Sequence, residues 1–148
     1  MACDSRRMKK FLVAAALATT ALMSSPIQAA GSALTNEIKA IDDSWAQIAY
    51  RPGSSASRTE ALGRLDRRAA ALVAKYPNSA EPLLWQGIVL GELAKNAGIL
   101  RKLSLANRAR DALTRAYAID PAAANGGAAM GLGVLYYQVP GAPMSLSL

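Results

Sequence analysis

The chain has 148 residues with 17 Lys or Arg, 10 Asp or Glu and no histidine, which gives a formal net charge of +7. Without histidine, and with Cys3 as the single cysteine, the common acid–base, metal and thiol sites are excluded. A chain of this length is expected to form one small domain.

The first segment, residues 1–30, has the features of a secretory signal peptide. A basic start is followed by residues 11–23, an uncharged run of 13 apolar and small residues. A membrane span needs about 18–20 residues, so the run is too short for one. Cleavage is expected after Ala29 or Ala30; an uncleaved anchoring or amphipathic helix is the alternative, and Met8 is a second candidate start. The mature chain is predicted to be periplasmic or secreted, without stable membrane insertion.

Removal of this segment changes the charge. The mature chain, residues 31–148, would carry 13 cationic and nine acidic residues, a net charge of +4. That excess is mild, and aromatic residues do not alternate with the cations of residues 57–76, as a nucleic-acid groove would require. The sequence predicts no nucleic-acid partner. It predicts instead a solvated basic face with Glu60 and Arg64 as an i,i+4 ion pair.

Two helices are predicted first in the mature chain. From Leu34 to Tyr50, apolar residues recur at spacings of three and four, and Trp45 on this stripe is expected in the core. A breaker segment follows, and the second helix is predicted from Ser57 to Tyr76. Ser57 with Glu60 matches the capping-box pattern at its start.

Three more helices are predicted after the turn at residues 76–79. Residues 80–97 form the third helix, and nearly every side of it is apolar between Leu83 and Leu90, which indicates a helix buried between neighbours. Gly87 in its middle indicates close approach of another backbone. Residues 99–118 form the fourth helix, with a stripe that includes Leu100, Leu103, Ala109, Leu113 and Tyr117. Residues 124–138 form the fifth, and no strand pattern competes with these helices.

The pattern resembles tetratricopeptide repeats, in which helix pairs carry small and large signature residues and end in a proline. The second-helix positions are matched by Ala109, Leu113, Ala116 and Pro121, and the closing proline of the preceding unit by Pro77. The first-helix positions are matched by Gly87, and again by Leu132, Gly133, Tyr136 and Tyr137. The resemblance implies an all-α helical-repeat array of about five antiparallel helices. The chain also resembles, loosely, the T component of tripartite ATP-independent periplasmic transporters.

Two features depart from that family. Pro77 and Pro121 are 44 residues apart, whereas the usual repeat is about 34 residues. The extra residues fall within 92–107 and should lengthen the helix pair or its connection. The unit begun by the fifth helix has no second helix to cover it, and repeat arrays normally end in a polar cap. We therefore expect a domain that lacks C-terminal helices, and an uncapped C-terminal face through which the chain could associate with itself.

The residues suggest no catalytic constellation. Asp42 and Asp43 are adjacent, so on a helix they diverge by about 100°. Asn125, Gly126 and Gly127 precede a helix and could hold an anion, but no P-loop Lys-Ser/Thr pair follows. The sequence predicts a non-enzymatic protein with no cofactor.

The resemblance implies a binding groove on the concave face of the array, lined by the first helix of each pair. By position, its lining would be Glu81, Leu84, Ile88, Glu92, Val134, Tyr137 and Gln138, with Tyr137 the favoured contact and Tyr136 on the packing side. The expected function is a protein or peptide interaction scaffold in the bacterial cell envelope. The alternative is a ligand-binding accessory protein of a periplasmic transporter.

Overall fold

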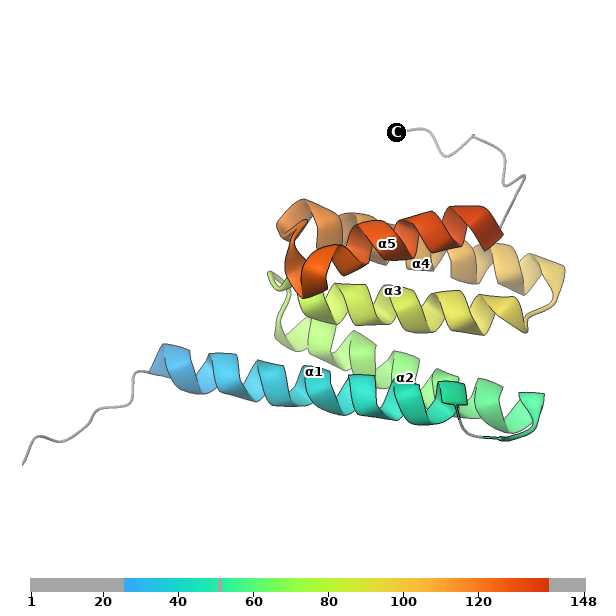
Figure 1. Cartoon of the computed structure of the whole chain (residues 1–148), viewed down its shortest axis with the longest axis horizontal. Coiled ribbons are helices and arrows are strands. Elements are labelled where there is room, and N and C mark those ends of the chain that lie inside the picture. The colour runs from blue at the N-terminus through green and yellow to red at the C-terminus, as the bar shows by residue number, and fades with distance from the viewer. Residues whose placement is uncertain (1–25, 51, 139–148) are drawn as a thin grey trace, which may run out of the picture.

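The structure, a computed structural model, describes residues 26–50 and 52–138, with side chains from residue 31 onward. This part of the chain is all helical and contains no strand. Its five helices are α1 (Pro26–Tyr50), α2 (Ser55–Lys75), α3 (Ala80–Lys95), α4 (Ile99–Ile119) and α5 (Ala123–Gln138). Successive helices run antiparallel (Figure 1). The predicted all-α class is confirmed.

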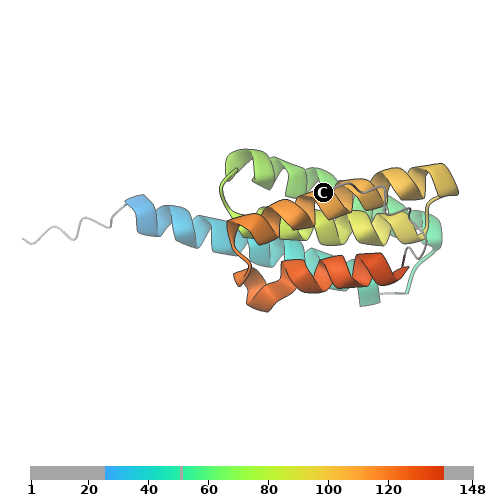
Figure 2. The ribbon, with the colours of Figure 1, turned by 90° about the horizontal axis from the view of Figure 1, so that it is seen from above.

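The helices are arranged around α3, which packs against each of the other four. α1 and α5 lie towards one side of the molecule, and α2 and α4 lie towards the other (Figures 1 and 2). No Cα atom of described α1 approaches within 8 Å of one in α5, although both helices contact α3. One side of α3 is therefore flanked by α1 and α5 without being closed over by them.

The first helix begins earlier than its apolar stripe predicts. α1 starts at Pro26, eight residues before Leu34. Proline is favoured in the first turn of a helix, because the backbone N–H groups of that turn have no acceptor within the helix and proline therefore loses no hydrogen bond there. The Ala-rich residues that follow are strong helix formers. The expected cleavage at Ala29 or Ala30 falls within this helix, whereas residues 1–25 of the predicted signal peptide lie outside the described residues.

The capping residue of α2 is not the one that the sequence predicts. Ser54 is the N-cap, and its Oγ accepts a hydrogen bond from the Ser57 N–H at 3.1 Å. Ser57 is the third helical residue, and its Oγ donates to the Ser54 carbonyl at 2.9 Å. Serines at positions 54, 55 and 57 offer the same chemistry, so only the backbone conformation decides among them. The Glu60–Arg64 pair is confirmed, with a 2.6 Å contact on an exposed surface.

α3 is the buried centre of the fold, as its apolar sequence predicts. Its buried residues are Ala80, Pro82, Leu83, Leu84, Gly87, Val89, Leu90, Leu93 and Ala94. The prediction for Gly87 is also confirmed. A Cβ atom there would lie 2.5 Å from Cγ of Leu113 and 3.2 Å from the Ala109 carbonyl oxygen. The missing side chain lets α4 approach α3 closely.

The additional length of the central unit lies in its helices. The connection between α3 and α4 is only residues 96–98, while α4 has 21 residues against 16 in α3. The start of α4 extends past the end of α3 (Figure 1). For this reason the first part of the predicted stripe is wrong: Leu100 is 82% exposed and Leu103 is 42% exposed. Burial begins at Leu105 instead. Tyr117, at the other end of the predicted stripe, is also exposed, at 48%.

The entry into α5 contains a left-handed turn. Asp120 Oδ1 accepts a hydrogen bond from the Ala122 N–H at 2.9 Å and so stabilises the turn that follows α4. Ala124, Asn125 and Gly126 then have φ values of 47°, 56° and 79°. The buried side of α5 consists of Gly127, Ala128 and Leu135. The predicted packing role of Tyr136 is wrong, since its side chain is 55% exposed.

The helices are joined by apolar packing and a few surface ion pairs. No charged or polar residue is fully buried in the part of the chain whose side chains are described. Lys75 Nζ of α2 contacts Glu37 Oε1 of α1 at 2.6 Å. Arg108 of α4 contacts Asp66 of α2 at 3.5 Å. Within residues 26–138 apart from position 51, none of the helices combines the length and apolarity that a membrane crossing requires.

Candidate functional site: an apolar groove over α3

A groove of about 370 Å³ lies over the side of α3 that α1 and α5 flank. α3 supplies most of its lining, Trp45 of α1 forms part of one wall, and Met130, Gly131, Val134 and other residues of α5 form the opposite wall. Leu113 reaches it from α4. Met130 is 67% exposed and Val134 is 48% exposed, so the α5 wall is open to solvent.

Glycines give the groove its depth. Four of its lining residues are Gly87, Gly91, Gly127 and Gly131, spaced four apart on α3 and on α5. Gly87 and Gly131 hold Leu113 between them, because a Cβ atom on either would lie within 3.1 Å of that side chain. Gly91 differs, since a Cβ atom there would meet nothing within 4 Å. Gly91 therefore leaves open space in the groove and fills no packing role.

Two tryptophans, Trp45 and Trp85, lie at the groove. Their ring centroids are 6.1 Å apart with planes inclined at 61°, an edge-to-face arrangement that is favourable for aromatic pairs. Trp45 also stands edge-to-face to Tyr50 at 6.3 Å. Trp45 is half-buried against the main core cluster and also lines the groove, so the prediction that it is a core residue is only partly right. These are the only tryptophans of the chain.

The charged residues of the lining are Glu92 and Lys95, one turn apart near the end of α3. Lys95 Nζ contacts Glu92 Oε1, so each charge has its partner within the helix. The groove presents no net charge to a ligand. Its remaining lining is carbon-rich, which favours an apolar ligand.

No family model, curated protein or solved structure matches the chain. The class of ligand is therefore inferred from the residues that line the groove. Its apolar lining, its two indole rings and the depth that its glycines create fit bulky apolar groups. They offer no set of polar groups with which to orient a highly polar ligand.

The predicted groove residues divide into two groups. Leu84, Ile88, Glu92 and Val134 line the groove together. Glu81, Tyr137 and Gln138 do not line it. Tyr137 is 86% exposed, and Gln138 borders an adjoining cavity of about 250 Å³ that shares Gly91, Lys95 and Leu135 with the groove.

The two tryptophans, the glycines and Met130 were not predicted as site residues. A signal was present for the glycines, which recur every fourth residue on α3 and again on α5. The sequence gives weaker evidence for Trp45 and Trp85 as site residues than for the glycines. An apolar residue at helical spacing predicts burial, but the spacing does not distinguish a core position from a groove wall.

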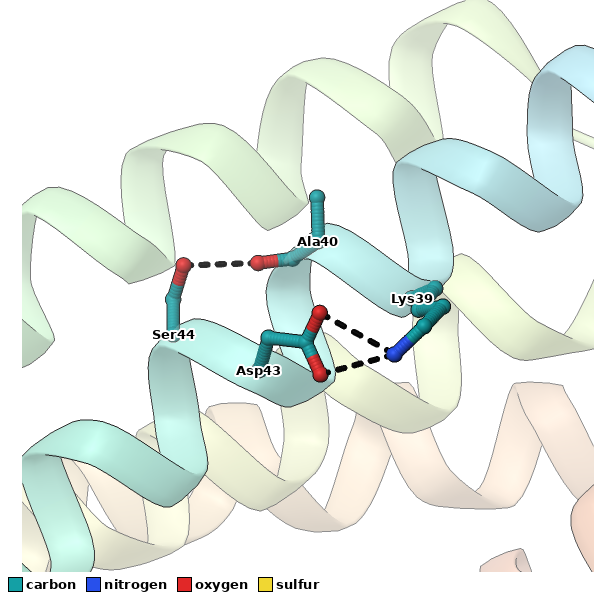
Figure 3. Close-up of polar contacts among 4 residues, drawn as sticks. All are labelled: Lys39, Ala40, Asp43 and Ser44. Carbon is teal, nitrogen blue, oxygen red and sulfur yellow. Dashed lines mark hydrogen bonds and ion pairs between the residues drawn. The ribbon is translucent and has the colours of Figure 1, made fainter.

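The carboxylates are dispersed on the surface. Asp43 accepts from Lys39 Nζ at 2.9 Å and 3.1 Å, as Figure 3 shows, and its neighbour Asp42 takes no part in that contact. This hydrogen bond raises the pKa of Lys39. In the same view, Ser44 Oγ donates to the Ala40 carbonyl at 2.6 Å. No cluster of three potential metal ligands occurs among the described residues.

Proposed function

We propose that this protein is a non-enzymatic interaction scaffold that holds an apolar segment of a partner protein or peptide in the groove over α3. The observation that carries the proposal is the groove itself: two indole rings, Met130 and Val134 around a surface deepened by Gly91. Aromatic and methionine side chains are enriched where proteins bind one another. A segment with one or two bulky apolar side chains would fill this volume.

The proposed scaffold is a tetratricopeptide-like helical array. Three observations support that assignment. Alternate helices, α1, α3 and α5, carry the groove, as the first helices of stacked pairs would. Pro77 and Pro121 each lie two residues after the end of a helix, α2 and α4 respectively. Gly87 permits the close contact of α3 with α4 that pairs α3 with its successor.

The proposed location is the bacterial periplasm or the extracellular space. It rests on the basic start and the apolar run of residues 1–30. In that compartment the mature chain would have no cysteine to oxidise. Its partner would be another envelope or secreted protein.

A selection for binding peptides tests this function. A random peptide library displayed on phage is selected on the wild-type protein alone, and the affinity of the selected peptides is then measured on Gly91→Leu. That side chain would extend into the groove, whereas a Cβ atom at Gly91 meets no neighbour. The selected peptides are expected to carry bulky apolar side chains and to lose at least about tenfold in affinity for Gly91→Leu, equivalent to about 1.4 kcal/mol.

The matched control is Gly63→Leu on α2. Gly63 is also in a helix interior, a Cβ atom there meets nothing within 4 Å, and it does not line the groove. Selected peptides should bind this variant as they bind the wild type. A selection that enriches no peptide, or peptides that Gly91→Leu still binds at wild-type affinity, would overturn the proposal.

A second candidate, a small-ligand accessory protein of a periplasmic transporter, is favoured by one observation. The groove volume of about 370 Å³ lies within the usual range of small-molecule sites, about 300–1,000 Å³. Native mass spectrometry of protein purified from periplasm separates the two functions. A bound small molecule that Gly91→Leu loses and Gly63→Leu retains would support this candidate over the scaffold.

A further inference from the structure

We infer that two copies of this protein associate through the outer face of α5, which we define as Ala129, Met130, Gly133, Tyr136 and Tyr137. α5 contains no charged residue over its 16 residues. A helix without a polar face is normally covered on all sides. Yet Met130, Tyr136 and Tyr137 are 67%, 55% and 86% exposed, and Ala129 and Gly133 are also exposed.

The chemistry of this face favours a second copy as its occupant. A two-fold contact places the same patch on both sides, so any charge in the patch would meet its own sign nearby. The outer face of α5 has none, whereas α4 alone carries five cationic residues and one acidic residue. A charged partner would find nothing complementary on α5. An identical uncharged face meets no repulsion there.

The shape of the face also permits a close contact. Ala129 and Gly133 are one turn apart, and a Cβ atom at Gly133 would meet nothing within 4 Å. Tyr136 and Tyr137 follow them, and Met130 lies beside them in sequence. The small residues allow two helices to approach, and the large ones bury area around that contact. Gly133 is the midpoint of residues 129–137, so the two-fold axis is expected near it.

The area available sets the expected strength. A covered aromatic side chain buries about 150–250 Å², so the exposed fractions of Tyr136 and Tyr137 offer roughly 200–350 Å² on each copy. Met130 and the Ala129–Gly133 strip add to this. Specific interfaces usually bury about 800 Å² per partner, and weak ones bury less than about 600 Å². The dimer should therefore be reversible and dependent on protein concentration.

Sedimentation of the full chain between about 5 and about 500 µM tests the dimer, because this range covers the affinities of weak interfaces. The wild type is expected to shift from monomer towards dimer over the range. Ala129→Glu should abolish the shift by placing two carboxylates in the contact. Ala71→Glu, at an exposed position near the end of α2, is the control and should behave as the wild type. Equal association of the two variants, or a wild type that stays monomeric throughout, would overturn the inference.

The response to salt separates this contact from an electrostatic one. Each copy has a formal net charge of +7, so two copies repel beyond the uncharged face. Raising the salt from about 0.01 M to about 0.1 M shortens the screening length from about 30 Å to about 10 Å. Association through α5 should become stronger over this range. Association that weakens with salt contradicts the proposed face.

A cross-link locates the contact independently of any association through residues 1–25. In a Cys3→Ser background, Gly133→Cys should form an intermolecular disulfide under mild oxidation. A close two-fold helix pair brings the Cα atoms within the 4.4–6.8 Å or so that a disulfide spans. Gly63→Cys is the matched control on α2. Equal cross-linking at the two positions places the contact elsewhere. Gly91→Leu leaves this face unchanged, so failure of the groove and failure of the dimer are distinguishable.

Discussion

At the scale of single residues, Leu113 is the side chain on which the packing of the groove depends. It is 2% exposed and lies between Gly87 of α3 and Gly131 of α5. Neither glycine can gain a Cβ atom without displacing it. Both positions therefore require glycine, because the Leu113 side chain occupies the space that a Cβ atom would need.

Gly87→Ala is expected to destabilise the protein. The added methyl would overlap Leu113 and press on the Ala109 carbonyl, and overpacking of this kind costs about 1–3 kcal/mol. The gain in helix propensity, about 1 kcal/mol, offsets only part of this. Gly91→Ala, one turn away with open space, should be neutral or stabilising. Urea denaturation of both variants measures the difference, and equal unfolding midpoints would show that the predicted overlap is absorbed.

The contact of Lys75 with Glu37 gives a pH-dependent contribution to the packing of α1 on α2. The hydrogen bond to the Glu37 carboxylate, together with Tyr76, raises the pKa of Lys75 above its ordinary value of 10.5. A raised pKa in the folded state contributes stability that is present below the unfolded value and is lost as pH rises through the folded value. Lys75 should therefore stabilise the fold at neutral pH and cease to do so in strong alkali.

Lys75→Arg isolates this effect, because arginine keeps its charge at high pH. Urea midpoints compared at about pH 9 and about pH 11.5, on either side of the ordinary lysine pKa, should fall further for the wild type than for the variant. Parallel behaviour of the two proteins would mean that the Lys75 contact makes no measurable contribution. That outcome would leave the packing of α1 on α2 unaffected, but it would contradict a stabilising ion pair between Lys75 and Glu37.

At the scale of elements, the left-handed turn at the start of α5 places Ala124, a residue with a Cβ atom, in a backbone conformation that favours glycine. Ala124 has φ 47° and ψ 47°, in a region that costs a residue with a Cβ atom about 1–2 kcal/mol. Glycine reaches this region freely. Ala124→Gly should therefore raise the free energy of unfolding by about 1 kcal/mol.

The reciprocal variant is Gly126→Ala, at φ 79°. It should lower stability by a similar amount, although a Cβ atom there meets nothing within 4 Å. Thermal unfolding of the two variants measures both effects. If Ala124→Gly destabilised the protein while Gly126→Ala did not, the chain would enter α5 by a different turn.

The five helices were predictable from periodicity and breakers, with most bounds within two residues. The main exception is α1, whose Ala-rich beginning carries helix propensity without an apolar stripe. The faces of α4 and α5 were less predictable. Leu100 and Leu103 are exposed because α4 extends past α3, and a stripe does not show where the neighbouring helix ends.

The groove was predictable only in part, for a physical reason. Leu84, Ile88 and Val134 were placed on it by the position of their helices in the resemblance. Gly91 and Gly131 were not, because glycine adds nothing to a hydrophobic stripe, yet it creates depth where helices flank one another. Tyr137 was expected to line the groove, but α5 turns Gly127, Ala128 and Leu135 towards the other helices and leaves both tyrosines outside.

At the scale of the whole molecule, the groove exists because α1 and α5 both pack against α3 while no Cα atom of described α1 lies within 8 Å of one in α5. Neither helix alone would enclose an apolar ligand. Their separation across α3 leaves Trp45 on one wall and Val134 on the other. Binding in the groove should therefore bridge α1 and α5 and stabilise the whole array.

The emission of Trp45 and Trp85 tests the central claim most directly, since both line the groove and the chain has no other tryptophan. A selected apolar peptide is titrated into the wild type, Gly91→Leu and Gly63→Leu. The wild type and Gly63→Leu should show the same saturable change in emission, and Gly91→Leu should require at least about tenfold more peptide. Binding to a folded Gly91→Leu at wild-type affinity, or binding that leaves tryptophan emission unchanged, would contradict the assignment of the groove as the binding site.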